Sequence, residues 1–132
     1  PILTHSLQYG SGIFEGIRAY STKKGTAIFR LEEHVKRFFN TAKIYNMNLG
    51  YSEKEIGDAI VESVRKNGLN EAYIRPFAFY NDDNIGLNVT GKKVSVAIVA
   101  VPFGSYFANK DKGNKALKHK LLQRGSREQQ RV

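Results

Sequence analysis

Residues 9–20, with the sequence YGSGIFEGIRAY, constrain the fold more than any other stretch of the chain. Glycines such as Gly12 and Gly16 occur where the backbone must bend sharply or come close to another group. Arg18 adds a fork of donors that suits a carboxylate or a phosphate. The β-branched and aromatic residues around them predict a strand over residues 12–20 that serves binding as well as packing.

The rest of the first hundred residues predicts further strands and two helices. A turn over residues 21–26, built on Gly25, follows the first strand, and residues 81–91 form a polar loop with Ile85 and Leu87 at its apolar tip. The predicted strands cover residues 12–20, 27–30, 72–80 and 93–101, and the predicted helices cover residues 31–45 and 52–67. This order predicts an α+β domain with an antiparallel or mixed sheet and its two helices on one face.

Apolar spacing and end signals support both helices. In the first helix, apolar residues recur at intervals of three and four, which places on one face Val35, Phe38, Phe39, Ala42 and Tyr45. The second helix begins with Ser52 and Glu55, which are spaced as a capping box. Gly68 follows its end and predicts a left-handed C-terminal cap.

Composition limits the class of protein. The 132 residues suffice for one domain with a hydrophobic core, and no apolar run approaches the roughly 20 residues of a membrane span. Cysteine is absent, which excludes disulfides and thiolate metal sites and fits a cytoplasmic protein. The net charge is +9, most of it in residues 105–132, where a basic tail could bind nucleic acid. Only Tyr106 and Phe107 interleave aromatic rings with that charge, so we interpret it as a solvated end and predict no nucleic-acid or membrane partner.

Three arginines are candidate binding residues, and each has a structural alternative. Arg18 could be an exposed strand residue, and Arg37 could lie on a solvated helix face with Glu33 as its partner. Arg75 lies between apolar neighbours in a strand, where an unpaired charge is costly.

Other residue types give weaker signals. Tyr9 and Tyr73 are candidates that could equally be packing residues. The histidines, His5, His34 and His119, are too scattered in the sequence for a metal site. No phosphate-binding glycine loop or dinucleotide fingerprint occurs in the chain.

Taken together, these segments resemble the small domain of class IV aminotransferases, and most of all the branched-chain amino acid aminotransferases. The resemblance rests on HSLQYGSGIFEGIRAY, FRLEEHVKRFFNTAKIYNM, AYIRPFAFYNDDNIGLN and VAIVAVPFGSYF, in that order, and covers residues 3–107. The motifs FEGIRAY and YIRP favour the branched-chain enzymes over D-amino acid aminotransferase and aminodeoxychorismate lyase, which share the fold.

The resemblance implies a role for particular residues. Arg37 is expected to bind the phosphate of pyridoxal 5′-phosphate, a dianion that a fixed guanidinium suits. The small-domain wall of the substrate pocket is expected to consist of Phe14, Gly16, Arg18, Tyr73 and Arg75. In that wall the two rings would enclose a branched aliphatic side chain, and the two arginines would orient carboxylates or hold the pocket by hydrogen bonds. The family is homodimeric, and Tyr9 and Leu87 match residues that reach into the partner subunit's site.

The lysine that forms the Schiff base in this family, in a motif like AKxxGNYxNS, has no match in the chain. We therefore expect residues 1–107 to be an aminotransferase small domain without its opening hairpin. Residues 108–132 are expected to be a divergent basic tail from truncation, a frameshift near Asn114 or proteolysis. Such a chain alone is expected to be inactive in amino transfer between branched-chain amino acids and 2-oxoglutarate, to bind no cofactor and to self-associate. The alternative is a non-catalytic interaction module derived from the same small domain.

Overall fold

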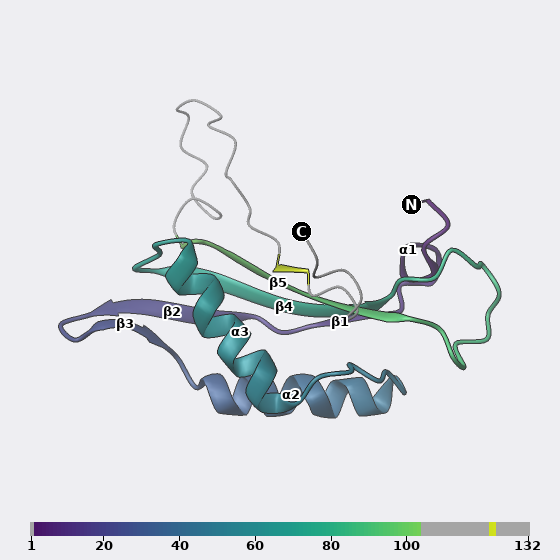
Figure 1. Ribbon diagram of the computed structural model, residues 1–132, viewed down its shortest axis with the longest axis horizontal. Coiled ribbons are helices and arrows are strands. Elements are labelled where there is room, and N and C mark those ends of the chain that lie inside the picture. Colours follow the sequence, from purple (N-terminus) through teal and green to yellow (C-terminus); the bar gives the residue numbers. More distant parts are fainter. Residues whose placement is uncertain (1, 104–121, 124–132) are drawn as a thin grey trace, which may run out of the picture.

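An antiparallel sheet organises the chain, with the strand order β3-β2-β4-β5-β6 and with β1 also paired to β4 (Figure 1). The structure, a computed structural model, describes residues 2–103 and 122–123. The strands are β1 Gly12–Phe14, β2 Ile17–Thr22, β3 Gly25–Ile28, β4 Ala72–Tyr80, β5 Val94–Pro102 and β6 Leu122–Gln123. The helices are α1 His5–Tyr9, α2 Leu31–Ile44 and α3 Glu53–Lys66. The predicted α+β fold class is confirmed.

Helices α2 and α3 cover one face of the sheet, as predicted (Figure 1). Every second side chain of β4 is buried, and Phe38 of α2 and Ile60 of α3 are at most 1% exposed in the core that these elements share. The alternate side chains of β4 are only partly buried and lie on the opposite face, together with the exposed Phe14 of β1. This second face is called the open face below, and it carries Phe14, Tyr73, Arg75, Phe77 and Phe79.

The helix ends follow the sequence signals. The Ser52 hydroxyl accepts from the Glu55 N–H at 3.2 Å, and the Glu55 carboxylate accepts from the Ser52 N–H at 2.9 Å, so the capping box is confirmed. Gly68 has a φ of +62°, the left-handed conformation predicted for it. Helix α2 ends at Ile44, one residue earlier than predicted.

The single strand predicted over residues 12–20 is wrong, because the strand is interrupted at Glu15 and Gly16. The register with β4 is the same on both sides of the break. Glu15 therefore lies opposite Pro76, and its N–H donates to the Pro76 carbonyl at 3.0 Å. Proline has no N–H with which to return the second bond of such a pair, so the ladder breaks without a change of register.

Two further features differ from the predictions. The sequence does not predict α1, a five-residue helix that ends at Tyr9 and is capped by Gly10, where φ is +64°. The turn predicted over residues 21–26 is shorter, because Thr22 pairs with Gly25 and leaves a two-residue loop between β2 and β3. The second strand of this hairpin consequently begins at Gly25 rather than at residue 27.

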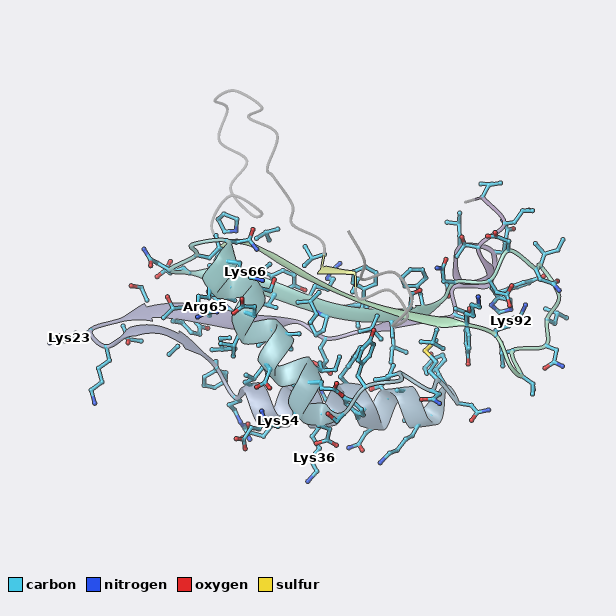
Figure 2. All side chains as sticks on the ribbon, viewed as in Figure 1. Lys23, Lys36, Lys54, Arg65, Lys66 and Lys92 are labelled. Carbon is cyan, nitrogen blue, oxygen red and sulfur yellow. The ribbon has the colours of Figure 1, made fainter. Side chains whose placement is uncertain are left out.

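The positive charges of the described residues are distributed over several elements. Lys23 lies at the tip of the β2–β3 hairpin and Lys36 on α2, and both point outward, whereas Lys92 in the β4–β5 loop donates to the Asn84 carbonyl at 2.9 Å (Figure 2). No helix within the described residues is long and apolar enough to cross a membrane. The basic segment singled out in the sequence, residues 108–132, lies outside the described residues except for Leu122 and Gln123.

Truncation of Ile60 tests whether α3 is held by the core described above. Ile60 is 0% exposed, whereas its neighbour Val61 on the same helix is 47% exposed. We expect Ile60→Ala to lower the free energy of unfolding by about 2–5 kcal/mol, since it leaves a cavity. Val61→Ala, the control, should change it by less than about 0.5 kcal/mol. Urea denaturation followed by circular dichroism measures both, and equal losses would contradict the packing.

Candidate functional site

Four of the five residues expected in the substrate wall meet on the open face. The guanidinium carbon of Arg75 lies 4.8 Å from the ring centre of Phe14 and 5.3 Å from that of Tyr73. Arg75 Nη2 donates to the Tyr73 hydroxyl at 3.0 Å. Gly16 faces the same hydroxyl, because a Cβ added to it would lie only 3.0 Å away. A cation, two aromatic rings and a gap kept open by a glycine therefore form one group.

Arg18 lies beside this group, but its guanidinium stacks on aromatic rings outside the group. Its Cα is paired with that of Tyr73 across the β2–β4 ladder. Its guanidinium carbon lies 3.6 Å from the ring centre of Phe103 and 4.9 Å from that of Tyr20. A guanidinium stacked on a ring keeps the donors at its edge in a fixed plane. Arg18 thus supplies a second oriented cation at the border of the group.

An open hollow of about 780 Å³ adjoins the group. Its walls include Phe14, Phe77 and Phe79 from the sheet and Leu7 from α1, and Arg75 is the charged residue that lines it. An apolar hollow with a few polar groups at fixed positions is the usual form of a small-molecule site. The chemistry of this one suits a ligand with an aliphatic part and a carboxylate.

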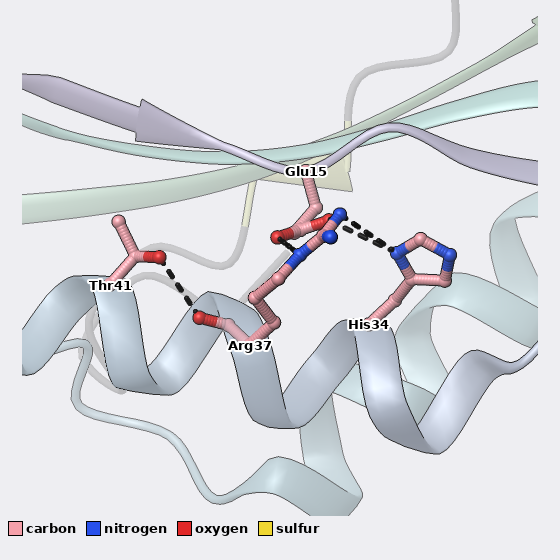
Figure 3. Close-up of polar contacts among 4 residues, drawn as sticks. All are labelled: Glu15, His34, Arg37 and Thr41. Atoms are coloured by element: carbon pink, nitrogen blue, oxygen red, sulfur yellow. Dashed lines mark hydrogen bonds and ion pairs between the residues drawn. The ribbon is translucent and has the colours of Figure 1, made fainter.

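Arg37 lies on α2 and faces the junction between β1 and β2 (Figure 3). Its Nε and Nη2 donate to the two carboxylate oxygens of Glu15, each at 2.6 Å. His34, one turn earlier on α2, has its Nδ1 3.0 Å from Glu15 Oε2. Because a carboxylate only accepts, Nδ1 carries the proton in this contact. The Glu15 side chain is 5% exposed, whereas that of Arg37 is 66% exposed.

The same contacts shift the protonation of both charged groups. Burial by itself raises the pKa of Glu15, but the hydrogen bonds from Arg37 and His34 outweigh it and hold the pKa below its ordinary value. The hydrogen bond to Glu15, and then its charge, raise the pKa of Arg37. The pair therefore stays fully ionised at neutral pH.

The geometry at Arg37 fits the phosphate group that the resemblance implies. Glu15 occupies the Nε and Nη2 edge of the guanidinium, and Nη1 has no partner among the described residues. A guanidinium held on one edge and accessible on the other is a suitable ligand for a phosphate dianion. Arg37 can therefore accept such a group without giving up its bond to the sheet.

The structure does not bring Arg37 into contact with the open-face group. Glu15 points toward α2, while Phe14 and Gly16, on either side of it in the chain, belong to the open face. The two parts of the candidate site thus lie on opposite sides of one short backbone segment.

Tyr9 and Leu87 lie apart from both groups, at the end of the molecule formed by α1 and the β4–β5 loop (Figure 1). The Tyr9 hydroxyl donates to the Ile85 carbonyl, which ties α1 to the tip of that loop. Leu87 is 78% exposed and Ile85 is 54% exposed. The apolar loop tip is therefore a surface feature of the described chain.

Two residues of the site have no assigned role in the sequence analysis. Glu15 and His34 complete the contacts of Arg37. Glu33, the partner named in the alternative interpretation of Arg37, pairs with Arg30 at 2.9 Å instead. The available signal for Glu15 is strand alternation, which puts it in phase with the apolar residues that face the helices. An acid in that row requires a cationic partner.

The model of the family described as "Amino-transferase class IV" matches residues 12–131. The chain belongs to the class IV aminotransferase family. The branched-chain-amino-acid aminotransferase of Pseudomonas aeruginosa is 51% identical over 105 residues, which make up 80% of this chain and 34% of that protein. The chain thus spans about a third of the length of the curated class IV relatives that it matches.

Solved structures of class IV aminotransferases have the same fold as this chain. The branched-chain aminotransferase of Thermoproteus uzoniensis with norvaline has a TM-score of 0.75 and 45% identity, covering 79% of this chain and 35% of that one. The branched-chain amino acid aminotransferase of Escherichia coli has a TM-score of 0.77 and 40% identity, covering 83% of this chain and 36% of that one. The family depends on pyridoxal phosphate.

The substitution Glu15→Gln tests the ion pair with Arg37 through stability. We expect the free energy of unfolding at pH 7 to fall by about 1–3 kcal/mol, because hydrogen bonds to a charged group are lost. The pKa of Glu15 is lower in the folded chain than its ordinary value of 4.5. Its contribution is therefore complete above that value and is lost as the pH falls through the folded-state pKa.

Denaturant unfolding at a series of pH values measures this effect. The wild type and the Glu15→Gln variant should differ most near neutral pH and converge as the pH falls below 4.5 and through the folded-state pKa of Glu15. Glu71→Gln, which changes an exposed carboxylate, is the matched control and should behave as wild type. A wild-type advantage that persists unchanged at low pH would contradict the ionic origin of the effect.

Proposed function

We propose that this chain forms the small-domain part of a pyridoxal phosphate-dependent branched-chain aminotransferase. The reaction is reversible amino transfer between branched-chain L-amino acids and 2-oxoglutarate. The observation that carries the proposal is the group formed by Phe14, Gly16, Tyr73 and Arg75, which combines an apolar surface with an oriented cation. The relatives that match the chain, described as branched-chain aminotransferases, support the same assignment.

In this proposal each residue has a physical task. Phe14 and Tyr73 enclose the aliphatic side chain of the substrate, and Arg75 and Arg18 orient carboxylates. Arg37 binds the cofactor phosphate through its Nη1 edge. When bound, the cofactor supplies the electron sink for the chemistry. The chain's own residues bind and orient, and we expect no turnover from the chain alone, because no residue here is assigned as the Schiff-base lysine.

We also propose that residues 1–107 are the small domain, that residues 108–132 are a divergent basic tail of which Leu122–Gln123 pairs with β5, and that the enzyme is a homodimer. Tyr9 and Leu87 would then reach toward the partner's site. The exposed apolar residues at the α1 end of the molecule support self-association: they are Ile2, Leu3, Leu7, Ile85 and Leu87. An exposed apolar patch of this kind is typical of a surface that another chain covers.

A chimaeric enzyme tests the proposed activity. The matched segment of the Pseudomonas aeruginosa relative is replaced by the matching segment of this chain, and transamination of leucine and norvaline with 2-oxoglutarate is measured. We expect activity that depends on Arg37, with Arg37→Ala raising the concentration of pyridoxal phosphate needed for half-maximal activity. A folded chimaera that binds the cofactor but transfers no amino group would reject the proposal.

Two glycine variants of the chimaera distinguish an effect on the substrate wall from a general effect on the fold. Gly16→Ala places a methyl group 3.0 Å from the Tyr73 hydroxyl and should displace the Tyr73–Arg75 pair. We expect kcat/KM for leucine to fall about five- to tenfold, corresponding to one lost hydrogen bond. Gly57→Ala on α3 is the control, because its new Cβ would meet no atom within 4 Å and α3 covers the other face of the sheet. Equal effects of the two substitutions would argue against a role for Gly16 in the pocket.

Borohydride reduction of the chain alone, after incubation with pyridoxal phosphate, tests the expected lack of turnover. Intact mass should show no adduct confined to one lysine. A single-lysine adduct that norvaline competes away would mean that the chain builds a complete cofactor site. A stable oligomer of defined size, combined with an inactive chimaera, would instead favour the non-catalytic interaction module.

A further inference from the structure

Glu15 is the only buried carboxylate among the described residues, and the family resemblance assigns it no role. Its side chain lies in the row that faces the helices, between the buried Ile13 and Ile17. A carboxylate at such a position opposes folding unless hydrogen bonds compensate it. The compensating donors come from one face of α2, from His34 and Arg37 (Figure 3).

The contact between Glu15 and Arg37 fixes a side chain that is otherwise mobile. Arginine has a long chain and loses considerable rotamer freedom when it is held in one geometry. Glu15 engages Nε and Nη2 together, so the plane of the guanidinium is set as well as its position. His34 donates to Oε2 and fixes the carboxylate in turn. Within the part of the chain that the structure describes, the Nη1 edge of Arg37 has no hydrogen-bond partner.

We infer that Glu15 is a positioning residue for Arg37, which it holds with the Nη1 edge available to a phosphate group. This inference deepens the proposed function, on which its link to the cofactor rests. The ligand chemistry is that of a phosphate monoester or inorganic phosphate. His34 acts indirectly, through its hydrogen bond to the Glu15 carboxylate.

Glu15 has two opposing effects on a bound phosphate. Its negative charge repels the anion. Its hydrogen bonds to Arg37 already fix that side chain, so phosphate binding does not carry the entropic cost of ordering it. Arg37 is 66% exposed, so water weakens the repulsion between the carboxylate and the phosphate. Water does not reduce the ordering cost. We therefore expect the positioning effect to be the larger one.

Nuclear magnetic resonance on the full chain tests this inference without any catalytic assay. The probe is inorganic phosphate, titrated while the Nε–H signal of Arg37 is followed in 15N-labelled protein. In the wild type we expect a well-ordered signal that shifts on phosphate addition. In Glu15→Gln we expect a mobile, rapidly exchanging signal and a phosphate affinity lower by about two- to tenfold.

Two further variants separate position from charge. Glu15→Asp keeps the charge but shortens the side chain, so it should also lose the ordered Arg37 signal and the phosphate affinity. Glu33→Gln removes a carboxylate from the same helix that pairs with Arg30 instead, and should not lower the affinity. Repeating the titrations at roughly 1 M salt, where the screening length is about 3 Å, should leave the loss in Glu15→Gln in place.

Equal or tighter phosphate binding by Glu15→Gln and Glu15→Asp would overturn the inference, as would a wild-type Arg37 signal that phosphate does not move. If Glu15→Gln does not fold, the Glu15→Asp result decides. The proposed function fails separately, through an inactive chimaera. An inactive chimaera together with the expected phosphate results would reject the aminotransferase assignment and leave the role of Glu15 intact.

Discussion

The pairing of Glu15 with Pro76, which lies opposite it in β4, determines how the sheet contacts α2. Proline cannot return a hydrogen bond, so the ladder between the β1–β2 segment and β4 opens at this point while its register is kept. Because the register is kept, the Glu15 side chain stays in the row of buried residues that faces the helices. A carboxylate there needs donors, and His34 and Arg37 of α2 provide them. The ladder thus opens at Pro76 while Glu15 stays buried, and the buried Glu15 carboxylate fixes Arg37 on the neighbouring helix.

The Glu15–Arg37 pair differs in burial from the exposed ion pairs of the described helices. Lys54 and Asp58 approach to 2.7 Å, but their side chains are 84% and 68% exposed, so water screens the pair and it adds little to stability. In the Glu15–Arg37 pair only the carboxylate has lost its water, and three hydrogen bonds replace that water. The guanidinium remains largely hydrated. The pair therefore avoids the double desolvation that makes fully buried ion pairs costly.

Local signals in the sequence predict the helices and strands, whereas the pairing between these elements determines which residues of the site come into contact. The capping box and the apolar helix faces depend on neighbouring residues alone, so they are predicted correctly apart from Tyr45, which is 50% exposed. The break at Glu15 depends on which β4 residue lies opposite, and only the tertiary register sets that. The same holds for Arg37, whose partner Glu15 is distant in sequence, whereas Glu33, the alternative partner suggested by helical spacing, is four residues away. The resemblance implies that Phe14 and Arg75 share a pocket wall, but their contact follows from the β1–β4 register.

Successive residues of a strand point to opposite faces, and this rule divides the candidate site within three residues. Phe14 and Gly16 serve the open face, and Glu15 between them serves α2. A shift of one residue would turn the carboxylate outward and bring Phe14 into the row of Ile13 and Ile17, so both halves of the site would be lost together. The distance between the proposed substrate wall and Arg37 is consequently fixed by a single backbone segment. That coupling is the physical reason why the glycine-rich stretch around Glu15 constrains the chain more than its helices do.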